Sequence, residues 1–324
     1  MGKIGSRPLG RSGIDISMIG MGCWAIGGPY KVEGKWSGWG TVDDAESVRA
    51  LRRAYDLGVT FFDTADAYGC GHSEELIAQA LGDVRDEIVL ATKVGNVFLE
   101  ETKEFTSRTG DPDHVRHACD ESLRRLNTDR IDLYQFHVGN YELEKAGETR
   151  AVFDELVAAG KVRYYGWSTD DPERAKFFSE SEHCVAVQQG FNIFGGNSDT
   201  LALCERENLA SVIRGPLAKG VLTGKFSRDS SPPKDEIRKT WNFSEGPIAD
   251  QIDTLGKIRD VLTADGRSLT QGALGWLWAR SPQTIPIPGF KTTTQVEENV
   301  GACGFGPLAA DQMKRIEELL GRAS

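Results

Sequence analysis

The sequence lacks the features that mark secreted, membrane-spanning and nucleic-acid-binding proteins. It has six cysteines but no Cys-x-x-Cys pair, so we predict reduced thiols in a cytoplasmic protein. There is no signal-peptide core and no apolar run of roughly 18 residues, so no membrane span is predicted. The formal net charge of −10 disfavours nucleic acid as a partner, because such a surface needs a basic stripe.

Three short motifs are weak evidence for function. Residues 1–6 match a myristoylation pattern, which is too short and degenerate to predict a lipid anchor. His114 and His117 are spaced i, i+3 on a predicted helix without a nearby Cys or carboxylate cluster, so we predict surface residues and no metal site. Residues 20–25 match G-x-G-x-x-A, but no helix is predicted before residue 43, which disfavours a Rossmann fold. A glycine strand exit that admits a ligand is the remaining interpretation.

What is present is a repeated alternation of strands and helices in an ordinary globular composition of 39% hydrophobic and 27% charged residues. A hairpin is predicted at residues 7–17, and eight strand–helix alternations follow without a break in composition. Such repetition implies parallel strands joined by right-handed crossovers. We therefore predict the α/β class and a single (β/α)₈ TIM barrel over residues 1–324, with an N-terminal β-hairpin and extra C-terminal helices; an open doubly wound sheet is the alternative. The predicted strands cover residues 18–22, 60–63, 88–93, 131–137, 162–168, 185–189, 209–213 and 284–287. Helix starts are predicted at Thr41, at Asp111-Pro112 and at Asp171-Pro172.

Three long segments outside this alternation are predicted to be loops at the same end of the barrel. They cover residues 25–42, 94–110 and 214–246, and their conformation cannot be derived from the sequence. We expect residues 214–246, after the seventh strand, to form a lid over cofactor or substrate. Aromatic residues in the other two loops are expected to wall a substrate pocket, namely Trp36, Trp39 and Phe98.

Four ionisable side chains lie at or just past the ends of predicted strands: Asp63, Tyr68, Lys93 and His137. Active sites of barrel enzymes gather at this rim. A lysine ammonium favours the phenolate of a nearby tyrosine, and a carboxylate keeps the lysine charged. A histidine can donate a hydrogen bond to an oxygen that becomes negative. The set suits protonation of a carbonyl oxygen; because no side chain supplies a hydride, a nicotinamide cofactor is implied.

A series of motifs in fixed order extends these four residues over nearly the whole chain. It comprises Gly22-x-Trp24, Asp63-Thr64-Ala65-x-x-Tyr68-Gly69, Thr92-Lys93, Asp132-Leu133-Tyr134-Gln135-x-His137, Gly166-x-Ser168, Gln188-x-x-Phe191-Asn192, Gly215-Pro216-Leu217-x-x-Gly220, and Ile285-Pro286-Ile287-Pro288-Gly289 running to Glu298-Asn299. With this series the chain resembles the aldo-keto reductases, in particular bacterial-type NADP(H)-dependent oxidoreductases.

The resemblance implies a (β/α)₈ barrel that binds NADPH (or NADP⁺) in an extended pose over the C-terminal rim. Tyr68 would be the general acid, Lys93 and Asp63 would tune it, and His137 would orient the carbonyl. The implied cofactor contacts are Ser168 and Gln188 at the carboxamide, Gly215, Leu217, Lys219 and Gly220 at the pyrophosphate, and Gly289, Lys291, Gln295, Glu298 and Asn299 at the adenosine end. Lys291 is the candidate for the 2′-phosphate. The glycine-rich context also favours a phosphate contact for Lys225, and Trp24 matches a family pocket aromatic that we place next to both cofactor and substrate.

Three positions depart from the family pattern. Thr169 stands where the family usually has Asn, which puts one carboxamide contact in doubt. Arg214 replaces an aromatic residue that often stacks on the nicotinamide; a guanidinium plane can also stack, and its charge can steer an anion. Asn140 stands where an Asp is usual, with no consequence that the sequence allows us to derive.

The leading hypothesis is therefore an NADPH-dependent reductase of aldehydes or ketones that acts on a small-molecule carbonyl substrate. One alternative is a regulatory module that binds NADP(H) with little turnover, like the barrel-shaped β subunits of potassium channels that resemble this family. Another is oxidation of a sugar or alcohol as the working direction. The sequence names no substrate and predicts no oligomeric state.

Overall fold

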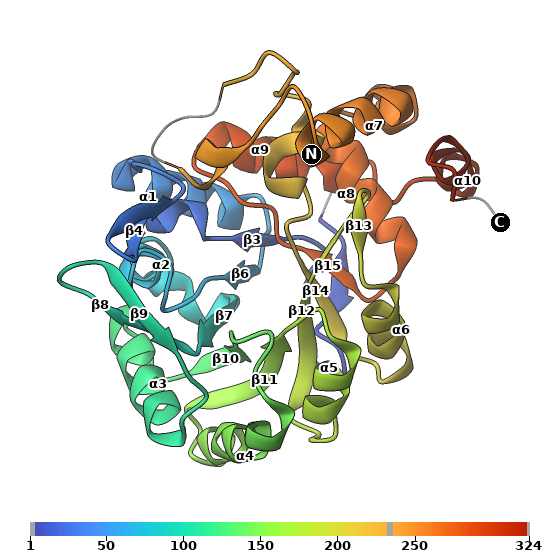
Figure 1. The fold of residues 1–324 in the computed structure, drawn as a ribbon. Helices are drawn as coiled ribbons and strands as arrows, with labels where there is room; N and C mark the ends of the chain where they lie inside the picture. Colours follow the sequence, from blue (N-terminus) through green and yellow to red (C-terminus); the bar gives the residue numbers. More distant parts are fainter. Residues whose placement is uncertain (1–3, 232–235, 323–324) are drawn as a thin grey trace.

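The computed structural model describes residues 4–231 and 236–322. The first residues of the myristoylation pattern, and Pro232 and Pro233 of the expected lid, lie outside the described residues. In the described ranges the chain forms a parallel barrel ringed by helices (Figure 1), which confirms the predicted fold class. Its strands are β3 (Gly20–Gly22), β6 (Phe61–Asp63), β7 (Val89–Val94), β10 (Ile131–Phe136), β11 (Val162–Ser168), β12 (Cys184–Asn192), β14 (Ala210–Arg214) and β15 (Thr284–Pro286).

Glycine closes the barrel where its first strand meets the segment after its last. Gly22 forms a parallel bridge with Gly289, and its N–H donates to the Pro288 carbonyl at 3.1 Å. A Cβ on Gly22 would lie 2.6 Å from the Ile287 carbonyl oxygen, so a side chain there would force the seam apart. This close approach explains the glycine-rich strand exit at residues 20–22 without a dinucleotide fingerprint.

The helices follow the predicted alternation. Asp111 and Asp171 cap their helices by accepting backbone N–H groups, with a proline in the first turn of each, as predicted. The first helix is capped by Asp43 and not by the predicted Thr41, because the Asp43 carboxylate reaches the Glu46 N–H. Among the described helices, none combines the length and apolar character that crossing a bilayer requires. The α-helices are α1 (Asp44–Asp56), α2 (His72–Leu81), α3 (Pro112–Leu126), α4 (Leu143–Ala158), α5 (Pro172–Ser179), α6 (Ser198–Arg206), α7 (Pro247–Leu262), α8 (Leu269–Arg280), α9 (Thr293–Gly301) and α10 (Ala310–Leu319).

The two ends of the barrel are finished differently. The predicted hairpin, β1 (Ser6–Pro8) with β2 (Asp15–Ser17), forms an antiparallel pair. Ile16 of β2 and Leu9, directly after β1, are buried in one cluster with Phe61, Leu133 and Val212. Apolar side chains therefore close the barrel on the hairpin side. The polar residues lie at the opposite side, at the carboxyl ends of the strands.

Two of the predicted loops contain strands. Residues 25–42 hold β4 (Pro29–Val32) and β5 (Lys35–Gly38), and residues 94–110 hold β8 (Asn96–Leu99) and β9 (Glu104–Arg108). They join in a four-stranded sheet of order β5-β4-β9-β8, seen beside the barrel mouth in Figure 1. The sequence prediction missed this sheet because its central β4–β9 pairing joins Lys31 to Glu104, far apart in the chain.

The described parts of residues 214–246 contain two short 3₁₀ helices, η3 (Ala218–Thr223) and η4 (Ile237–Thr240). Glu236, just before η4, forms an antiparallel bridge with Trp39. The Lys239 ammonium donates to the Trp36 carbonyl at 2.8 Å. This part of the segment therefore lies against the hairpin β4–β5. Its action as a lid remains a prediction.

Candidate active site

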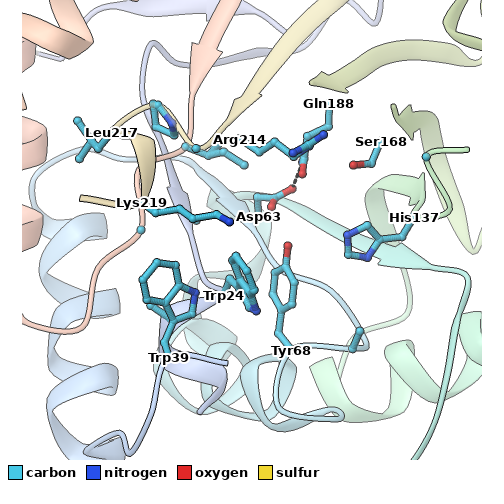
Figure 2. A pocket seen from close by; sticks show the side chains of 18 of the residues that line it. Trp24, Trp39, Asp63, Tyr68, His137, Ser168, Gln188, Arg214, Leu217 and Lys219 are labelled. Carbon is cyan, nitrogen blue, oxygen red and sulfur yellow. Dashed lines mark hydrogen bonds between the residues drawn. The ribbon is translucent and has the colours of Figure 1, made fainter. Parts of the chain in front are cut away.

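A cavity of about 1720 Å³ opens at the carboxyl ends of the barrel strands, and Figure 2 looks into it. Most residues predicted for catalysis or binding line it, which brings together positions from residue 24 to residue 299. Lys93 is fully buried beneath it. The predicted residues in the lining are Trp24, Trp39, Asp63, Tyr68, His137, Ser168, Gln188, Arg214, Gly215, Leu217, Lys219, Gly220, Lys225, Gly289, Lys291, Gln295, Glu298 and Asn299.

Lys93 joins Asp63 to Tyr68 at the floor of the cavity. Its ammonium donates to Asp63 Oδ1 at 2.5 Å, to the Thr64 carbonyl at 2.6 Å and to Tyr68 Oη at 3.1 Å. All three ammonium donors are thus used, and both charged side chains are buried. The geometry fixes the phenol hydroxyl at the edge of the cavity, as Figure 2 shows between Trp24 and His137.

The second oxygen of Asp63 is held by two glutamines. Gln135 Nε2 donates to Asp63 Oδ2 at 2.9 Å and Gln188 Nε2 donates to it at 2.7 Å. The sequence prediction gave Gln135 no role. A signal was present, because residues two apart on a strand share a face, and Gln135 precedes His137 by two. The buried carboxylate therefore has three donors that satisfy its oxygens and fix its position.

The electrostatics favour a protonated Tyr68. Burial raises the pKa of Tyr68 above its ordinary value, and the nearby Lys93 opposes this only in part. Burial alone would lower the pKa of Lys93, but Asp63 and Tyr68 together raise it. At neutral pH the pair is consequently a phenol beside an ammonium, a state that can donate a proton.

His137 is held by a residue that the sequence prediction missed. Asn96 Nδ2 lies 3.1 Å from His137 Nδ1, and the rings of Tyr68 and His137 meet edge to face with centroids 6.0 Å apart. Burial, followed by the charges of Lys93, Arg214 and Arg108, lowers the pKa of His137 well below its ordinary range. The imidazole is therefore neutral.

Two of the three departures from the family pattern, Arg214 and Thr169, have partners within the chain. Arg214 forms an ion pair with Asp170 at 2.5 Å, and Asp170 also accepts the Gly190 N–H at 2.6 Å. Thr169 donates its hydroxyl to the Gly139 carbonyl at 2.7 Å. Arg214 is consequently fixed at the cavity wall, whereas the Thr169 hydroxyl donates to a backbone carbonyl.

Aromatic side chains form one wall of the cavity. Trp24 contacts Trp39 edge to face with centroids 5.3 Å apart, and it stacks on Tyr68 at 6.1 Å. Tyr30 and Phe105, which are not among the predicted pocket residues, line it as well. Their rings meet at 4.8 Å.

Two predicted pocket residues, Trp36 and Phe98, do not belong to the lining. Trp36 is 50% exposed and pairs with Lys31 across the hairpin, which places it on the opposite face from Tyr30. Phe98 lies on the edge strand β8 and contacts Phe105 at 6.2 Å, so Phe105 stands between it and the cavity. The alternation of side chains along a strand explains the position of Trp36. The place of β8 at the edge of the unpredicted sheet explains that of Phe98.

Three cationic side chains in the cavity lining lie near one another: Lys225, Arg238 and Lys291. A Cβ on Gly220 would lie 3.2 Å from Lys225 Nζ and 3.3 Å from Arg238 Nη1. Burial, followed by the charges of Arg238 and Lys291, lowers the pKa of Lys225. The nearby Glu236 is already paired with Arg238 at 2.6 Å. The group therefore carries an excess of positive charge that favours a bound anion.

The segment after β15 is held in shape by its own polar residues. The Lys291 ammonium donates to the carbonyls of Trp39 and Thr41, and Gln295 accepts the Lys291 N–H at 2.7 Å. Glu298 accepts the Ser268 hydroxyl at 2.9 Å. Contacts within the chain thus already hold Lys291, Gln295 and Glu298 in place around the cavity.

Two buried donors that line the cavity have no partner in the described part of the chain, Trp39 Nε1 and Thr270 Oγ1. Buried polar groups are nearly always hydrogen-bonded. These two donors are therefore available to a polar ligand in the cavity.

Known proteins of one family match this chain over nearly its whole length. A model of the Aldo/keto reductase family matches residues 18–321. An aldo-keto reductase from Schizosaccharomyces pombe, yakc, named for NADP⁺, is 32% identical over 97% of this chain and 91% of its own length. An NADH-specific methylglyoxal reductase of Escherichia coli is 29% identical over 97% of this chain and 99% of its own. The solved glycerol dehydrogenase AKR11B4 of Gluconobacter oxydans superposes with a TM-score of 0.85 at 29% identity, covering 100% of this chain and 97% of its own.

Proposed function

The chain belongs to the aldo/keto reductase family and is an oxidoreductase that acts on carbonyl or alcohol groups, and we propose that it reduces aldehydes and ketones to alcohols with NADPH. The observation that carries this proposal is the chain of contacts Asp63–Lys93–Tyr68 at the edge of the cavity. It presents a phenol proton to the cavity and a cation to the phenolate that proton transfer leaves behind. A carbonyl oxygen beside Tyr68 is the acceptor that this arrangement suits.

When bound, a nicotinamide cofactor supplies the hydride to the carbonyl carbon. Tyr68 gives its proton to the carbonyl oxygen, and Lys93 stabilises the phenolate. Asp63 keeps Lys93 charged and in place, and its own charge is held by Gln135 and Gln188. His137 donates a hydrogen bond to the same carbonyl oxygen from the other side.

The cavity fits a dinucleotide together with a small substrate. Its volume of about 1720 Å³ exceeds the roughly 300–1,000 Å³ of an ordinary small-molecule pocket. Ser168 and Gln188 would hold the carboxamide. The Gln188 amide N–H groups face Asp63 and Gln135, so its oxygen is the atom left to accept. The segment 214–246 would cover the pyrophosphate.

The preference for NADPH rests on the excess of positive charge around Lys225, Arg238 and Lys291. The 2′-phosphate is the group that distinguishes NADPH from NADH, and cations bind it with charge-assisted hydrogen bonds. Relatives named for NADP⁺ and for NADH are both present, so the residues of this chain must decide the matter. Lys291 is the side chain that we assign to this phosphate.

Two other functions remain as outcomes of the test. A relative by structure is named glycerol dehydrogenase, which would correspond to the oxidative direction at the same site. A regulatory module would bind NADP(H) without turnover. A cytoplasmic location stays a prediction.

The test measures cofactor binding and turnover separately, in the protein and in Tyr68→Phe. Tryptophan fluorescence should report tighter binding of NADPH than of NADH in both proteins. On addition of an aromatic aldehyde, the protein should oxidise NADPH, and Tyr68→Phe should do so with kcat lower by roughly 10²–10⁴-fold, the usual worth of a general acid. Full kcat in Tyr68→Phe would overturn the mechanism, and tight binding without oxidation across several carbonyls would favour the regulatory module.

The cofactor assignment has its own variant and control. Lys291→Met should weaken NADPH binding about 10-fold, the worth of one charge-assisted hydrogen bond, and leave NADH binding unchanged. Lys257→Met, which removes an exposed charge on α7, should change neither. Equal weakening for both cofactors in Lys291→Met would remove the 2′-phosphate assignment.

A further inference from the structure

We propose that Asn96 is a positioning residue that fixes His137 as the tautomer with its proton on Nε2, so that the ring presents an N–H to the substrate carbonyl. The proposal rests on the proposed reductase function. Neither the motif series nor the departures from it involve Asn96, which lies three residues after Lys93 at the first position of β8.

The tautomer follows from the chemistry of the contact. Asn96 Nδ2 lies 3.1 Å from His137 Nδ1. An amide nitrogen has two donors and no acceptor, so Nδ1 must offer its lone pair. A neutral imidazole carries one proton, and that proton is consequently on Nε2.

The other end of the ring faces the reacting groups. His137 lines the cavity, and its ring meets Tyr68 edge to face with centroids 6.0 Å apart. Figure 2 shows the His137 ring and the Tyr68 hydroxyl on the same side of the pocket. A carbonyl oxygen that takes the phenol proton can therefore also accept from Nε2–H.

The charges around His137 make the choice of tautomer matter. Lys93 on β7, Arg108 on β9 and Arg214 on β14 all disfavour an imidazolium. The carboxylates near the ring are engaged elsewhere, Asp63 by Lys93 and Asp170 by Arg214. An imidazolium would donate from both nitrogens, whereas the neutral ring donates from one only, so a fixed partner at Nδ1 decides whether the site has a donor at all.

The backbone holds Asn96 against the ring. His137 N–H donates to the Val94 carbonyl at 2.7 Å, two residues from Asn96. Gly95 between them has φ +129°, and a Cβ on it would lie 2.7 Å from Val138 Cγ2. Asn96 itself is only 7% exposed and pairs with Arg108 across the hairpin. The amide is thus built into the turn that follows β7.

Nuclear magnetic resonance of ¹⁵N-histidine-labelled protein tests the tautomer without any substrate. Two-bond ¹⁵N–¹H correlations distinguish the three ring states, and His137→Gln identifies the signal among the five histidines. We expect His137 to show protonated Nε2 and unprotonated Nδ1 from about pH 6 to pH 8, a range in which an ordinary histidine with a pKa near 6.5 changes its charge. A ring with protonated Nδ1 in this range would overturn the proposal.

The pH profile of Asn96→Asp separates positioning from simple packing. A carboxylate at residue 96 accepts from Nδ1–H and favours the imidazolium, so Nε2–H survives only at low pH. We expect kcat to match the parent near pH 6 and to fall on the order of 10²-fold as pH rises, the usual worth of one lost donor. The parent should show no such descending limb, and Asn96→Leu should lose activity without gaining one.

Asn127→Asp, at the exposed end of α3, makes the same charge change and should leave the profile unchanged. A profile in Asn96→Asp identical to that of the parent would refute the role of Asn96. If instead Tyr68→Phe keeps full activity while the ring shows the expected tautomer, the proposed function fails and the Asn96 contact stands as structure alone.

Discussion

Two buried ion pairs flank the strands of this barrel, and they differ in what surrounds them. Inside the barrel Lys93 pairs with Asp63 at 2.5 Å; outside it Arg125 on α3 pairs with Glu74 on α2 at 2.7 Å. All four side chains are almost fully buried. The inner pair reaches the cavity through Tyr68, whereas the outer pair lies under helices.

The partners show what each pair is for. Asp63 has two neutral amide donors besides Lys93, so it stays satisfied if the lysine is lost. Arg125 also binds Glu100 at 2.6 Å, and Glu74 also accepts the Thr92 hydroxyl at 2.6 Å. The outer pair thus connects two helices, a strand and the turn between β8 and β9. We infer that the inner pair serves chemistry and the outer pair serves stability.

The largest expected effect is loss of activity in Lys93→Met. Without the ammonium, nothing stabilises the phenolate of Tyr68, and kcat should fall on the order of 10³-fold, within the range of acid catalysis and a charged stabiliser. Stability should fall less than in the outer-pair variant below, because Asp63 keeps two donors. Steady-state kinetics and urea unfolding of the same sample measure both quantities; a large loss of stability with little loss of kcat would reverse the comparison.

The next effect is loss of stability in Arg125→Met. Removing one partner of a buried pair leaves an uncompensated charge and costs about 3–5 kcal/mol, while kcat of the folded protein should stay within a few-fold of the parent. Urea unfolding measures the free energy. Arg124→Met is the matched control, since Arg124 is an exposed neighbour paired with Glu121 and should cost under about 0.5 kcal/mol.

A double variant sharpens this prediction. Glu74→Gln combined with Arg125→Met removes both charges and should recover part of the lost stability. No recovery would mean that packing of the arginine stem, and not its charge, holds the helices together.

The smallest effect concerns Asp66, a third carboxylate beside the outer pair. Its Oδ1 has no partner among the described residues, and burial, followed by the charge of Glu74, raises its pKa well above the ordinary value. A raised pKa means that its contribution to stability is present at low pH and is lost as pH rises through the folded-state value. Asp66→Asn should therefore raise Tm relative to the parent by about 2 °C at high pH, roughly 1 kcal/mol, and less at low pH. Scanning calorimetry across pH measures this, and a gain that shrinks with rising pH would contradict it.

The residues of the inner pair could be predicted from the sequence, whereas those of the outer pair could not. Asp63, Tyr68, Lys93 and His137 could be found because parallel strands end at one rim, so residues that follow strands meet there. Glu74 and Arg125 lie on helix faces in ordinary charged stretches, and no local pattern distinguishes them from solvated charges. Burial, which gives them their energy, is a property of the packed helices.

Trp36 and Phe98 show why the pocket wall could not be predicted from residue type alone. Their aromatic character suggested a pocket wall, but a four-stranded sheet decides which face each side chain takes. One residue along a strand reverses that face, which puts Trp36 on the opposite face from Tyr30. Phe98 shares a face with its partner Phe105 but lies on the edge strand beyond it, so Tyr30 and Phe105 line the cavity.

Local patterns in the sequence predict the barrel, the helix starts at Asp111 and Asp171, and the four residues at the strand ends, because periodicity, capping and strand exits are local and directional. Tertiary packing sets the rest: Gln135 and Gln188 share Asp63, Asn96 contacts His137, and Lys225, Arg238 and Lys291 lie together. These are contacts between side chains from different strands and loops, and their distances depend on how the whole chain packs.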